Sequence, residues 1–423
     1  MPAVPSSPIL SVVDDSDPLL GELAEVPHAP DGLLELLAQV PDPRKRRGIR
    51  HGLTGVLAVA LSAVVAGAQS FVAIAEWAAD AGPEVLMRLG VTGVRPCEST
   101  FRRCLQRLAP DHLDQLIGAW MWLHTSTIGG RRVIAFDGKT LRGARGAAGN
   151  LVHLLAGLCQ QTGAVLAQLA VDVKTNEIPM LRKLLDTLDI TGTVITADAL
   201  HCQRDTAEYI IGRGGHYIFT VKDNQPKLRR KLKNLPWKQI PILDTSTEHD
   251  HGRTAKRVLK ATEITEGIGF PGAVQVLQLT RTVTDHKTGK RHTEVVYAVT
   301  SLSIADAKPA QIAAWLRGHW AIENKLHWVR DVTYAEDHSQ IRTGGGPQVM
   351  ATLRNTAISV LRLNGHTNIA AALRHHARNH LRPVKHTAEL VKPDFAETVG
   401  GTRWVRMCDP EQNEFCVSTG VEW

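Results

Sequence analysis

The chain has 423 residues, of which 43% are hydrophobic and 22% are charged. A polypeptide of this length and composition can bury a large apolar core, so we expect a globular protein with about two or three domains and exclude intrinsic disorder of the whole chain. The formal net charge of +7 favours an anionic partner, although this excess is modest for so long a chain.

The six cysteines form no Cys-x-x-Cys pair and no zinc-type spacing, so they are predicted to be reduced in a cytoplasmic protein. Residues 1–8 show neither the basic start nor the apolar core of a signal peptide, and we expect no secretion. The uncharged segment Gly52–Ala75 imitates a membrane span. Its Ala and Gly content and its polar interruptions favour a buried helix or helix pair instead.

Residues 1–30 are rich in Pro, Ser and acidic side chains, which predicts a disordered tail. Helical patterns run from residue 31 to about residue 127 and predict a helical N-terminal domain. Within it, Ser99 is expected to cap a helix over residues 100–108 that exposes Arg102 and Arg103. Such a helix could enter a DNA major groove, but a surface helix with a basic outer side fits the spacing equally well.

After residue 127 the pattern changes to alternating strands and helices. Strands are predicted over residues 132–136, 152–159 and 165–173, followed by helix 178–188, strand 194–197, helix 203–212 and strand 217–221. This order predicts an α/β fold of the ribonuclease H-like (retroviral integrase-type) class. Such a fold carries one acidic residue on the first strand and one on the fourth, and pairs these strands at the centre of the sheet.

A further run of strands separates this order from the last helices. Alternation over about residues 243–299, with a turn at 285–289, predicts a small β-domain inserted at residues 237–300. The predicted catalytic domain is therefore split over residues 128–236 and 301–385, and its last part is helical from 346 to about 382. Residues 386–423 are predicted only as a C-terminal tail.

Three carboxylates stand out in this arrangement. Asp137 ends an apolar run, Asp198 ends the next predicted central strand, and Glu323 lies in the amphipathic stretch Arg317–Trp328. Each has an ordinary explanation by itself: a turn, a helix cap and a helix salt bridge. On the expected elements in the expected order, they predict a catalytic set that holds two Mg²⁺ ions for phosphodiester chemistry, with Mn²⁺ as a substitute.

Basic residues cluster at 44–50, 222–233 and 374–385. Each cluster by itself is as often a solvated face as a binding surface. Three clusters beside a metal-type acidic set favour a nucleic acid, because neutralising phosphates releases counterions and drives binding.

The chain resembles an insertion-sequence transposase with a DDE triad, of the H-repeat-associated branch. The resemblance spans about residues 31–385 and rests on the segments Phe136–Gly143, Thr196–His201, Phe219–Gln225, His251–Arg253 and Arg317–Trp328 with Asp331. It implies that Asp137, Asp198 and Glu323 are the metal ligands. It also implies strand cleavage at terminal inverted repeats and joining of the 3′ ends to target DNA, by a homodimer on double-stranded DNA that is associated with the nucleoid.

Basic and aromatic residues near these motifs are candidates for holding phosphates or a flipped base. They are Lys139, Lys222, Arg253, Arg257, Arg317, His319, Lys325 and Arg330, with Trp320 and Trp328 available for stacking. Outward helix charge is the alternative interpretation of these side chains.

The sequence departs from the family pattern at a few positions. Ala255 stands where a Glu often follows the His-Gly-Arg motif, and Leu316, His319 and Arg330 occupy the Tyr, Arg and Lys places of the wider signature. The triad itself is intact. The alternative to an enzyme is a catalytically silent, transposase-derived DNA-binding protein.

Overall fold

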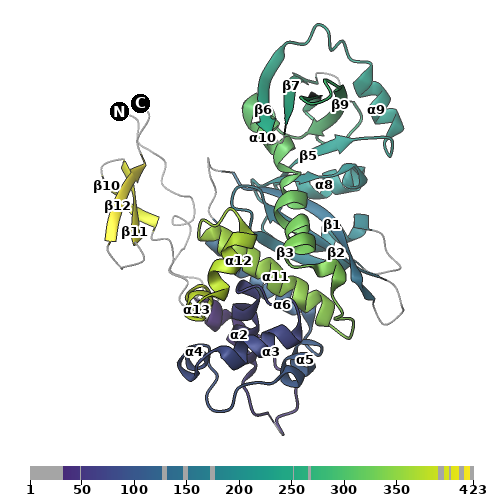
Figure 1. Cartoon of the computed structure of the whole chain (residues 1–423). Helices are drawn as coiled ribbons and strands as arrows, with labels where there is room; N and C mark the ends of the chain where they lie inside the picture. The colour runs from purple at the N-terminus through teal and green to yellow at the C-terminus, as the bar shows by residue number, and fades with distance from the viewer. Residues whose placement is uncertain are drawn as a thin grey trace, which may run out of the picture. The chain divides into compact units, whose positions relative to one another are not determined.

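The structure, a computed structural model, describes residues 32–47, 49–125, 131–145, 151–171, 177–250, 252–264 and 268–388, and the backbone of strands beyond residue 394 (Figure 1). The tail predicted over residues 1–30 lies outside the described residues. Residues Asp31–Trp423 cluster as one compact unit.

The N-terminal part of this unit is helical, as predicted. Its helices are α1 (Leu33–Ala38), α2 (Leu53–Val65), α3 (Phe71–Asp80), α4 (Pro83–Arg88), α5 (Glu98–Leu105) and α6 (Pro110–His124). The uncharged segment 52–75 forms α2 and the start of α3, and α2 is buried on almost every side. Among the described residues, no helix is long and apolar enough to cross a membrane.

Helix α5 begins earlier than we predicted. Cys97 precedes its first residue and Ser99 lies inside the helix, so the predicted cap at Ser99 is wrong. Ser99 instead accepts through its backbone carbonyl a hydrogen bond from Arg103 Nε at 3.0 Å.

The central sheet contains the strands predicted after residue 127. They are β1 (Val133–Arg145), β2 (Leu151–Cys159), β3 (Val165–Val171), β4 (Val194–Ala197) and β5 (His216–Val221). The sheet order is β3-β2-β1-β4-β5-β9-β8-β7-β6. The connecting helices are α7 (Glu177–Asp186), α8 (Arg204–Gly212) and α9 (Pro226–Lys233). The predicted α/β class is therefore confirmed, and its sheet has nine strands.

The register of β1 and β4 determines where two of the acidic residues lie. The strands run parallel, and Phe136 pairs with Ala197. The next residue on each strand is an aspartate, so Asp137 and Asp198 lie at the same edge of the parallel pair. Strand β1 continues beyond Asp137 and pairs with β2, which excludes the alternative that Asp137 only shapes a turn.

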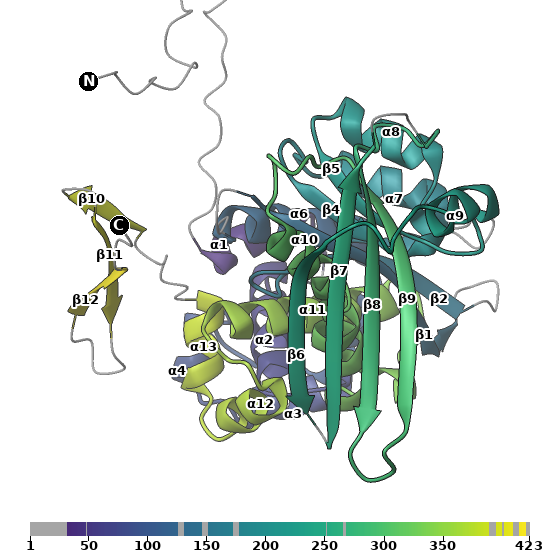
Figure 2. The same cartoon turned by 90° about the horizontal axis from the view of Figure 1, so that it is seen from above.

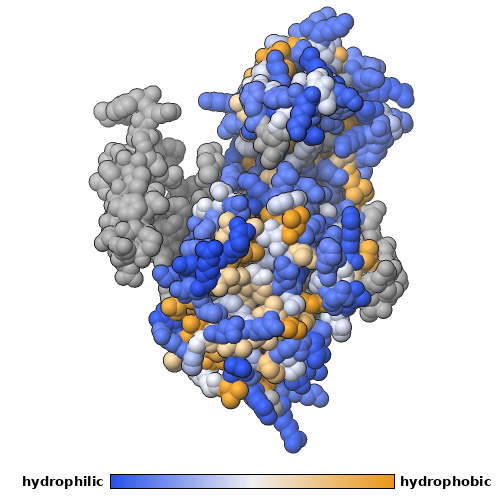
Figure 3. All heavy atoms as spheres, in the orientation of Figure 1, coloured by the Kyte–Doolittle hydropathy of each residue, from blue (hydrophilic) through white to orange (hydrophobic). Residues whose placement is uncertain are grey.

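The inserted strands extend the same sheet and do not form the separate β-domain that we predicted. They are β6 (Ile242–Asp250), β7 (Arg253–Glu263), β8 (Gln275–Asp285) and β9 (Arg291–Thr300). Strand β9 pairs antiparallel with β5, and Figure 2 shows the four strands side by side. This pairing satisfies the backbone groups that β5 would otherwise expose as an edge strand. The face in Figure 3 is mostly hydrophilic over these strands.

The last helices join the N-terminal helices to the sheet. They are α10 (Pro309–Gly318), α11 (Gly346–Leu363), α12 (Ile369–Ala377) and α13 (Leu381–Ala388). Helix α11 is almost fully buried and contacts α2, α6 and β3. As a result, one hydrophobic core continues from the N-terminal helices into the sheet.

The C-terminal tail contains secondary structure that we did not predict. Strands β10 (Phe395–Val399), β11 (Thr402–Cys408) and β12 (Glu414–Thr419) form an antiparallel sheet.

Gly118 allows α6 to lie directly on β3. A Cβ atom at this position would lie 2.4 Å from the carbonyl oxygen of Leu166, which belongs to a buried strand that cannot easily move. We expect Gly118→Ala to lower the free energy of unfolding by about 1–3 kcal/mol, measured by urea denaturation. Gly212→Ala at the end of α8 is the matched control, because a Cβ there meets nothing within 4 Å. Equal stability of both variants would contradict this packing.

Candidate active site

The stretch that carries Glu323 follows α10 as an irregular helix. Residues Glu323–His327 and Val329–Thr333 are π-helical. Such wide turns are rare and occur frequently at functional sites. Here the turn brings two side chains together, because His327 Nδ1 lies 3.1 Å from Glu323 Oε2. We call residues 321–333 the acid helix.

The acid helix meets β1 at Asp137. The same His327 Nδ1 atom lies 3.5 Å from Asp137 Oδ2. One ligand atom from each of Asp137, Glu323 and His327 lies within 4.8 Å of the others, which is a spacing that could hold a metal ion. Side chains from β1 and from a helix almost two hundred positions later in the chain therefore converge.

Asp198 lies beside this group at the end of β4. Its Oδ1 atom accepts a hydrogen bond from Leu200 N at 2.9 Å and caps the short 3₁₀ helix Ala199–His201. The capping alternative is therefore real for Asp198. Its charge still reaches the acidic group, since it helps to raise the pKa of Asp137.

The electrostatics of the group fit a divalent cation. Burial raises the pKa of Asp137 to about 6, and the Asp198 and Glu323 carboxylates add to this rise while His327 opposes it. The hydrogen bond with His327 lowers the pKa of Glu323. The other ring nitrogen of His327, Nε2, is buried without a hydrogen-bond partner. A bound cation would offset the repulsion between these carboxylates.

The prediction that Lys139 contacts DNA is wrong, because its side chain is buried. It follows Asp137 by two residues on the same face of β1, and the side chain is only 7% exposed. Its ammonium group pairs with Asp331 of the acid helix and lies 3.9 Å from Asp337 Oδ1. Because Asp331 belongs to the acid helix, this ion pair holds the acid helix against β1.

The prediction that Arg330 contacts DNA is also wrong, because its side chain is fully buried. Its Nε donates to Glu336 Oε2 at 2.8 Å, and Arg354 Nη1 on α11 donates to Glu336 Oε1 at 2.8 Å. Burial raises the pKa of Glu336, but the two guanidinium groups outweigh it and keep this pKa below the usual value. Arg330 therefore anchors the acid helix to α11.

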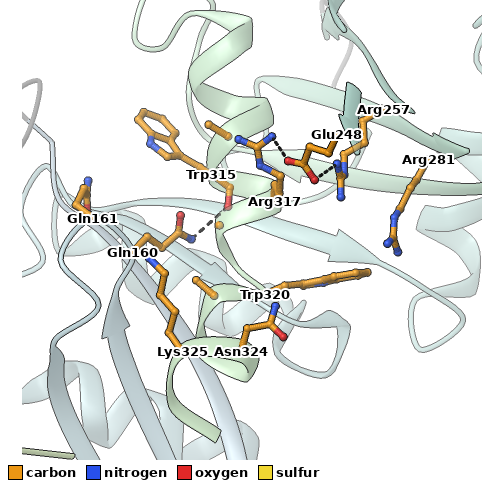
Figure 4. A pocket seen from close by; sticks show the side chains of 13 residues that line it. Gln160, Gln161, Glu248, Arg257, Arg281, Trp315, Arg317, Trp320, Asn324 and Lys325 are labelled. Carbon is orange, nitrogen blue, oxygen red and sulfur yellow. Dashed lines mark hydrogen bonds and ion pairs between the residues drawn. The ribbon is translucent and has the colours of Figure 1, made fainter. Parts of the chain in front are cut away.

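A pocket of about 540 Å³ lies between the inserted strands and the acid helix (Figure 4). Its charged and aromatic lining residues are Glu248, Arg257, Arg281, Trp315, Arg317, Trp320 and Lys325. Glu248 accepts from Arg257 at 2.8 Å and from Arg317 at 3.0 Å. The Arg281 guanidinium lies 5.3 Å from the centre of the Trp320 ring, and Trp320 is about half exposed.

A second pocket, of about 770 Å³, continues along the acid helix. Lys325 and Asn324 line both pockets, and Trp328 and Arg362 line the second. The structure thus brings four of the predicted DNA-contact residues, Arg257, Arg317, Trp320 and Lys325, to one surface, with Trp328 next to it.

His319, a predicted candidate for holding phosphates or a flipped base, is half-buried beside Thr196 of β4. Burial lowers its pKa to about 4, so the imidazole is neutral near pH 7 and cannot supply a positive charge to a phosphate. Its Nδ1 lies 3.4 Å from the hydroxyl of Thr196 on β4, two residues before Asp198. Lys222, which follows β5, is exposed.

The remaining predicted contacts lie outside the two pockets. Arg253 is exposed at the start of β7, with its Nε 3.6 Å from Asp285 Oδ2. Arg102 and Arg103 are exposed on α5, where Arg102 Nε pairs with Glu98 Oε1 at 3.0 Å.

Two residues of the site were missed from the sequence. His327 lies four residues after Glu323 inside a motif that we had singled out, and this helical spacing could have identified it. Arg281 lies in the middle of β8 and had no signal in the sequence. It meets Trp320 only because the inserted strands lie beside the stretch that follows α10.

Comparison with known proteins identifies the family of this chain. The family model described as a transposase DDE domain matches residues 128–360, and the model of its associated domain matches residues 34–121. The chain belongs to the DDE-domain transposase family. The predicted resemblance to H-repeat-associated transposases is confirmed, because curated proteins of that name match most of the chain.

Three relatives of this transposase show how far the similarity extends. Protein YbfL of Escherichia coli K12 is 31% identical, over 78% of this chain and 90% of its own length. The "H repeat-associated putative transposase YhhI" of the same strain is 30% identical, over 78% and 90%. The "Putative transposase YncI" of Escherichia coli O157:H7 is 29% identical, over 78% and 87%.

The Glu336 interactions yield a stability prediction for this transposase. Glu336→Gln would leave the buried guanidinium groups of Arg330 and Arg354 without a counter-charge, and we expect a loss of about 3–5 kcal/mol in the free energy of unfolding. Chemical denaturation followed by circular dichroism measures it. Glu98→Gln, which breaks a solvent-exposed pair with Arg102, should cost less than about 1 kcal/mol. Similar small losses in both variants would show that Glu336 is not an anchor.

Proposed function

We propose that this transposase cleaves DNA at the terminal inverted repeats of an insertion sequence and joins the 3′ ends to target DNA in a divalent-metal-dependent reaction. The observation that carries the proposal is the convergence of Asp137, Glu323 and His327 beside Asp198. Membership of the DDE family supports a nuclease chemistry in general.

We propose a ribonuclease H-like core formed by residues 128–236 and 301–385. The order β3-β2-β1-β4-β5 and the parallel pairing of β1 with β4 support it. The helical residues 31–127 would contribute to DNA binding through Arg102 and Arg103, and residues 237–300 would be an insertion that adds strands and one wall of the pocket.

Asp137, Asp198 and Glu323 would hold the metal ions, with His327 as a further ligand or as the group that orients Glu323. A bound pair of Mg²⁺ ions would activate the attacking oxygen and stabilise the leaving oxygen. The oxygen ligands suit Mg²⁺, and the imidazole of His327 makes Mn²⁺ a suitable substitute. His327 Nδ1 contacts the carboxylates of both Glu323 and Asp137, so these two acidic side chains would be directed toward the same metal ion.

The pocket beside the acid helix would hold the DNA backbone. Arg257, Arg317 and Lys325 offer positive charge there, and the exposed face of Trp320 offers a surface on which an unpaired base can stack. The ion pairs of Arg257 and Arg317 with Glu248 would exchange for phosphate contacts when DNA binds. Lys222 and Arg253 are additional exposed cations that would contact DNA outside the pocket.

The proposed partner is double-stranded DNA, both the element ends and the target. A homodimer is expected because transposition pairs two ends. We expect the protein in the cytoplasm, on the nucleoid, because that is where this substrate lies. The alternative of a catalytically silent DNA-binding protein is less favoured, because the acidic set is complete.

The decisive test is strand cleavage by the purified protein on DNA that carries the ends of its own element, with Mg²⁺ or Mn²⁺. Glu323→Gln removes a ligand charge at nearly constant shape. We expect cleavage to fall by more than the roughly 10–100-fold typical of losing a residue that only supports a metal ligand, while DNA binding persists. Glu208→Gln, an exposed change on α8, is the matched control and should cut normally. Binding without cutting by the unchanged protein would favour the silent alternative.

The raised pKa of Asp137 predicts how the metal requirement changes with pH. The metal binds the ionised carboxylate, and the pKa of about 6 means that protons compete with the metal below that pH. The Mg²⁺ concentration for half-maximal cleavage should therefore be nearly constant above pH 7 and rise by up to about tenfold for each pH unit below 6. Titrations of Mg²⁺ at pH 5.0 and 7.5 measure this. Equal requirements at both values would be inconsistent with a protonatable Asp137 ligand.

A further inference from the structure

Three histidines meet at the C-terminal helices, and one of them, His366, lines the second pocket. His366 lies in the turn after α11, His376 in α12 and His386 in α13. One ring nitrogen from each lies within 4.8 Å of the others. The ring centroids of His376 and His386 are 4.8 Å apart, and the centroid of the His366 ring lies 5.4 Å from that of His376. We call them the histidine cluster.

The hydrogen bonds fix which nitrogen atoms face the centre of the cluster. His376 Nδ1 lies 2.7 Å from the Ala372 carbonyl oxygen, which can only accept. That nitrogen therefore carries the proton in a neutral ring, and Nε2 presents a bare lone pair. His386 Nε2 lies 2.8 Å from His376 Nε2 and donates a hydrogen bond to it. A metal would replace this hydrogen bond, and the neutral His386 ring would then carry its proton on Nδ1 and bind the metal through Nε2.

We propose that the histidine cluster is a binding site for a borderline-soft transition-metal dication of the Zn²⁺ class. Three imidazole nitrogens with an open fourth position are a ligand set that zinc uses in proteins. The hard ion Mg²⁺ prefers oxygen ligands, so this site and the carboxylate site would select different ions. The proposal does not depend on the proposed cleavage reaction.

The distances and the charge state both suit such an ion. Nitrogen atoms bound at about 2.0–2.1 Å in a tetrahedron lie about 3.3 Å apart, so the contact between His376 and His386 would open slightly and His366 would move inward. Burial lowers the pKa of His376 and, to about 4, that of His386. The rings are therefore neutral near pH 7, and a metal would not have to displace a proton from a charged imidazole.

The position of the ligands indicates what the metal would do. The three residues come from three consecutive elements, so one ion would cross-link the end of α11 to α12 and α13. Next to His386, the Thr387 hydroxyl accepts from Ser62 Oγ of α2 at 3.0 Å. The metal would therefore hold the C-terminal helices, with their basic residues 374–385, against the N-terminal helices. His366 and His386 are half-buried, which leaves the fourth position open to solvent.

The test is metal binding by the full chain, in variants that all carry Glu323→Gln to weaken the carboxylate site. Chelator-stripped protein is titrated with Zn²⁺ against a chromophoric competitor, and with Co²⁺ to record the visible absorption of a tetrahedral complex. We expect one equivalent of Zn²⁺ to bind and to raise Tm by a few degrees. His376→Gln should weaken this binding by at least tenfold and abolish the Co²⁺ absorption.

Two further variants make the result decisive. His366→Gln changes a half-buried ring in a turn, so it tests the site even if the His376 variant does not fold, and it should also weaken Zn²⁺ binding by at least tenfold. His375→Gln changes the exposed neighbour of His376 and should leave Zn²⁺ binding unchanged. Equal Zn²⁺ affinity in the His366 and His375 variants, or Co²⁺ bound without tetrahedral absorption, would overturn the proposal.

Discussion

The buried ion triad of Arg330, Glu336 and Arg354 determines where the acid helix lies. Desolvating these charges is costly, and the cost is offset only while the carboxylate of Glu336 bonds both guanidinium groups at 2.8 Å. Because Arg354 belongs to α11, which is packed between the N-terminal helices and the sheet, the triad ties the acid helix to an almost fully buried helix. Lys139 adds a second tie, from β1 to Asp331.

These ties explain how side chains from two distant segments of the chain, β1 and the acid helix, come together. Asp137 and Lys139 share one face of β1, and the acid helix runs past both. Asp331 meets Lys139 while His327 and Glu323, earlier in the helix, meet Asp137. Burial, with a smaller contribution from the neighbouring carboxylates, raises the pKa of Asp137, and ion pairs only a few residues away hold the acidic group together despite this cost.

The inserted strands contribute through the sheet and not as an independent domain. Because β9 pairs with β5, the positions of β6 to β8 are set by the same hydrogen-bond ladder that positions β1 and β4. Glu248, Arg257 and Arg281 consequently face Arg317 and Trp320 across one pocket. The nearly complete burial of α11 similarly makes the helical N-terminal part continuous with the core of the sheet.

The sequence by itself determined the order of strands and helices, the aspartates that follow the apolar runs of β1 and β4, and the motif around Glu323, because periodicity and apolar runs are local properties of the chain. Only the tertiary structure decided which charges face solvent. Lys139 and Arg330 look like DNA contacts in the sequence, but both are buried against carboxylates that lie near them only after folding. The joining of β9 to β5, the role of His327 and the meeting of three histidines were equally hidden, since each depends on contacts between elements whose packing no local pattern encodes.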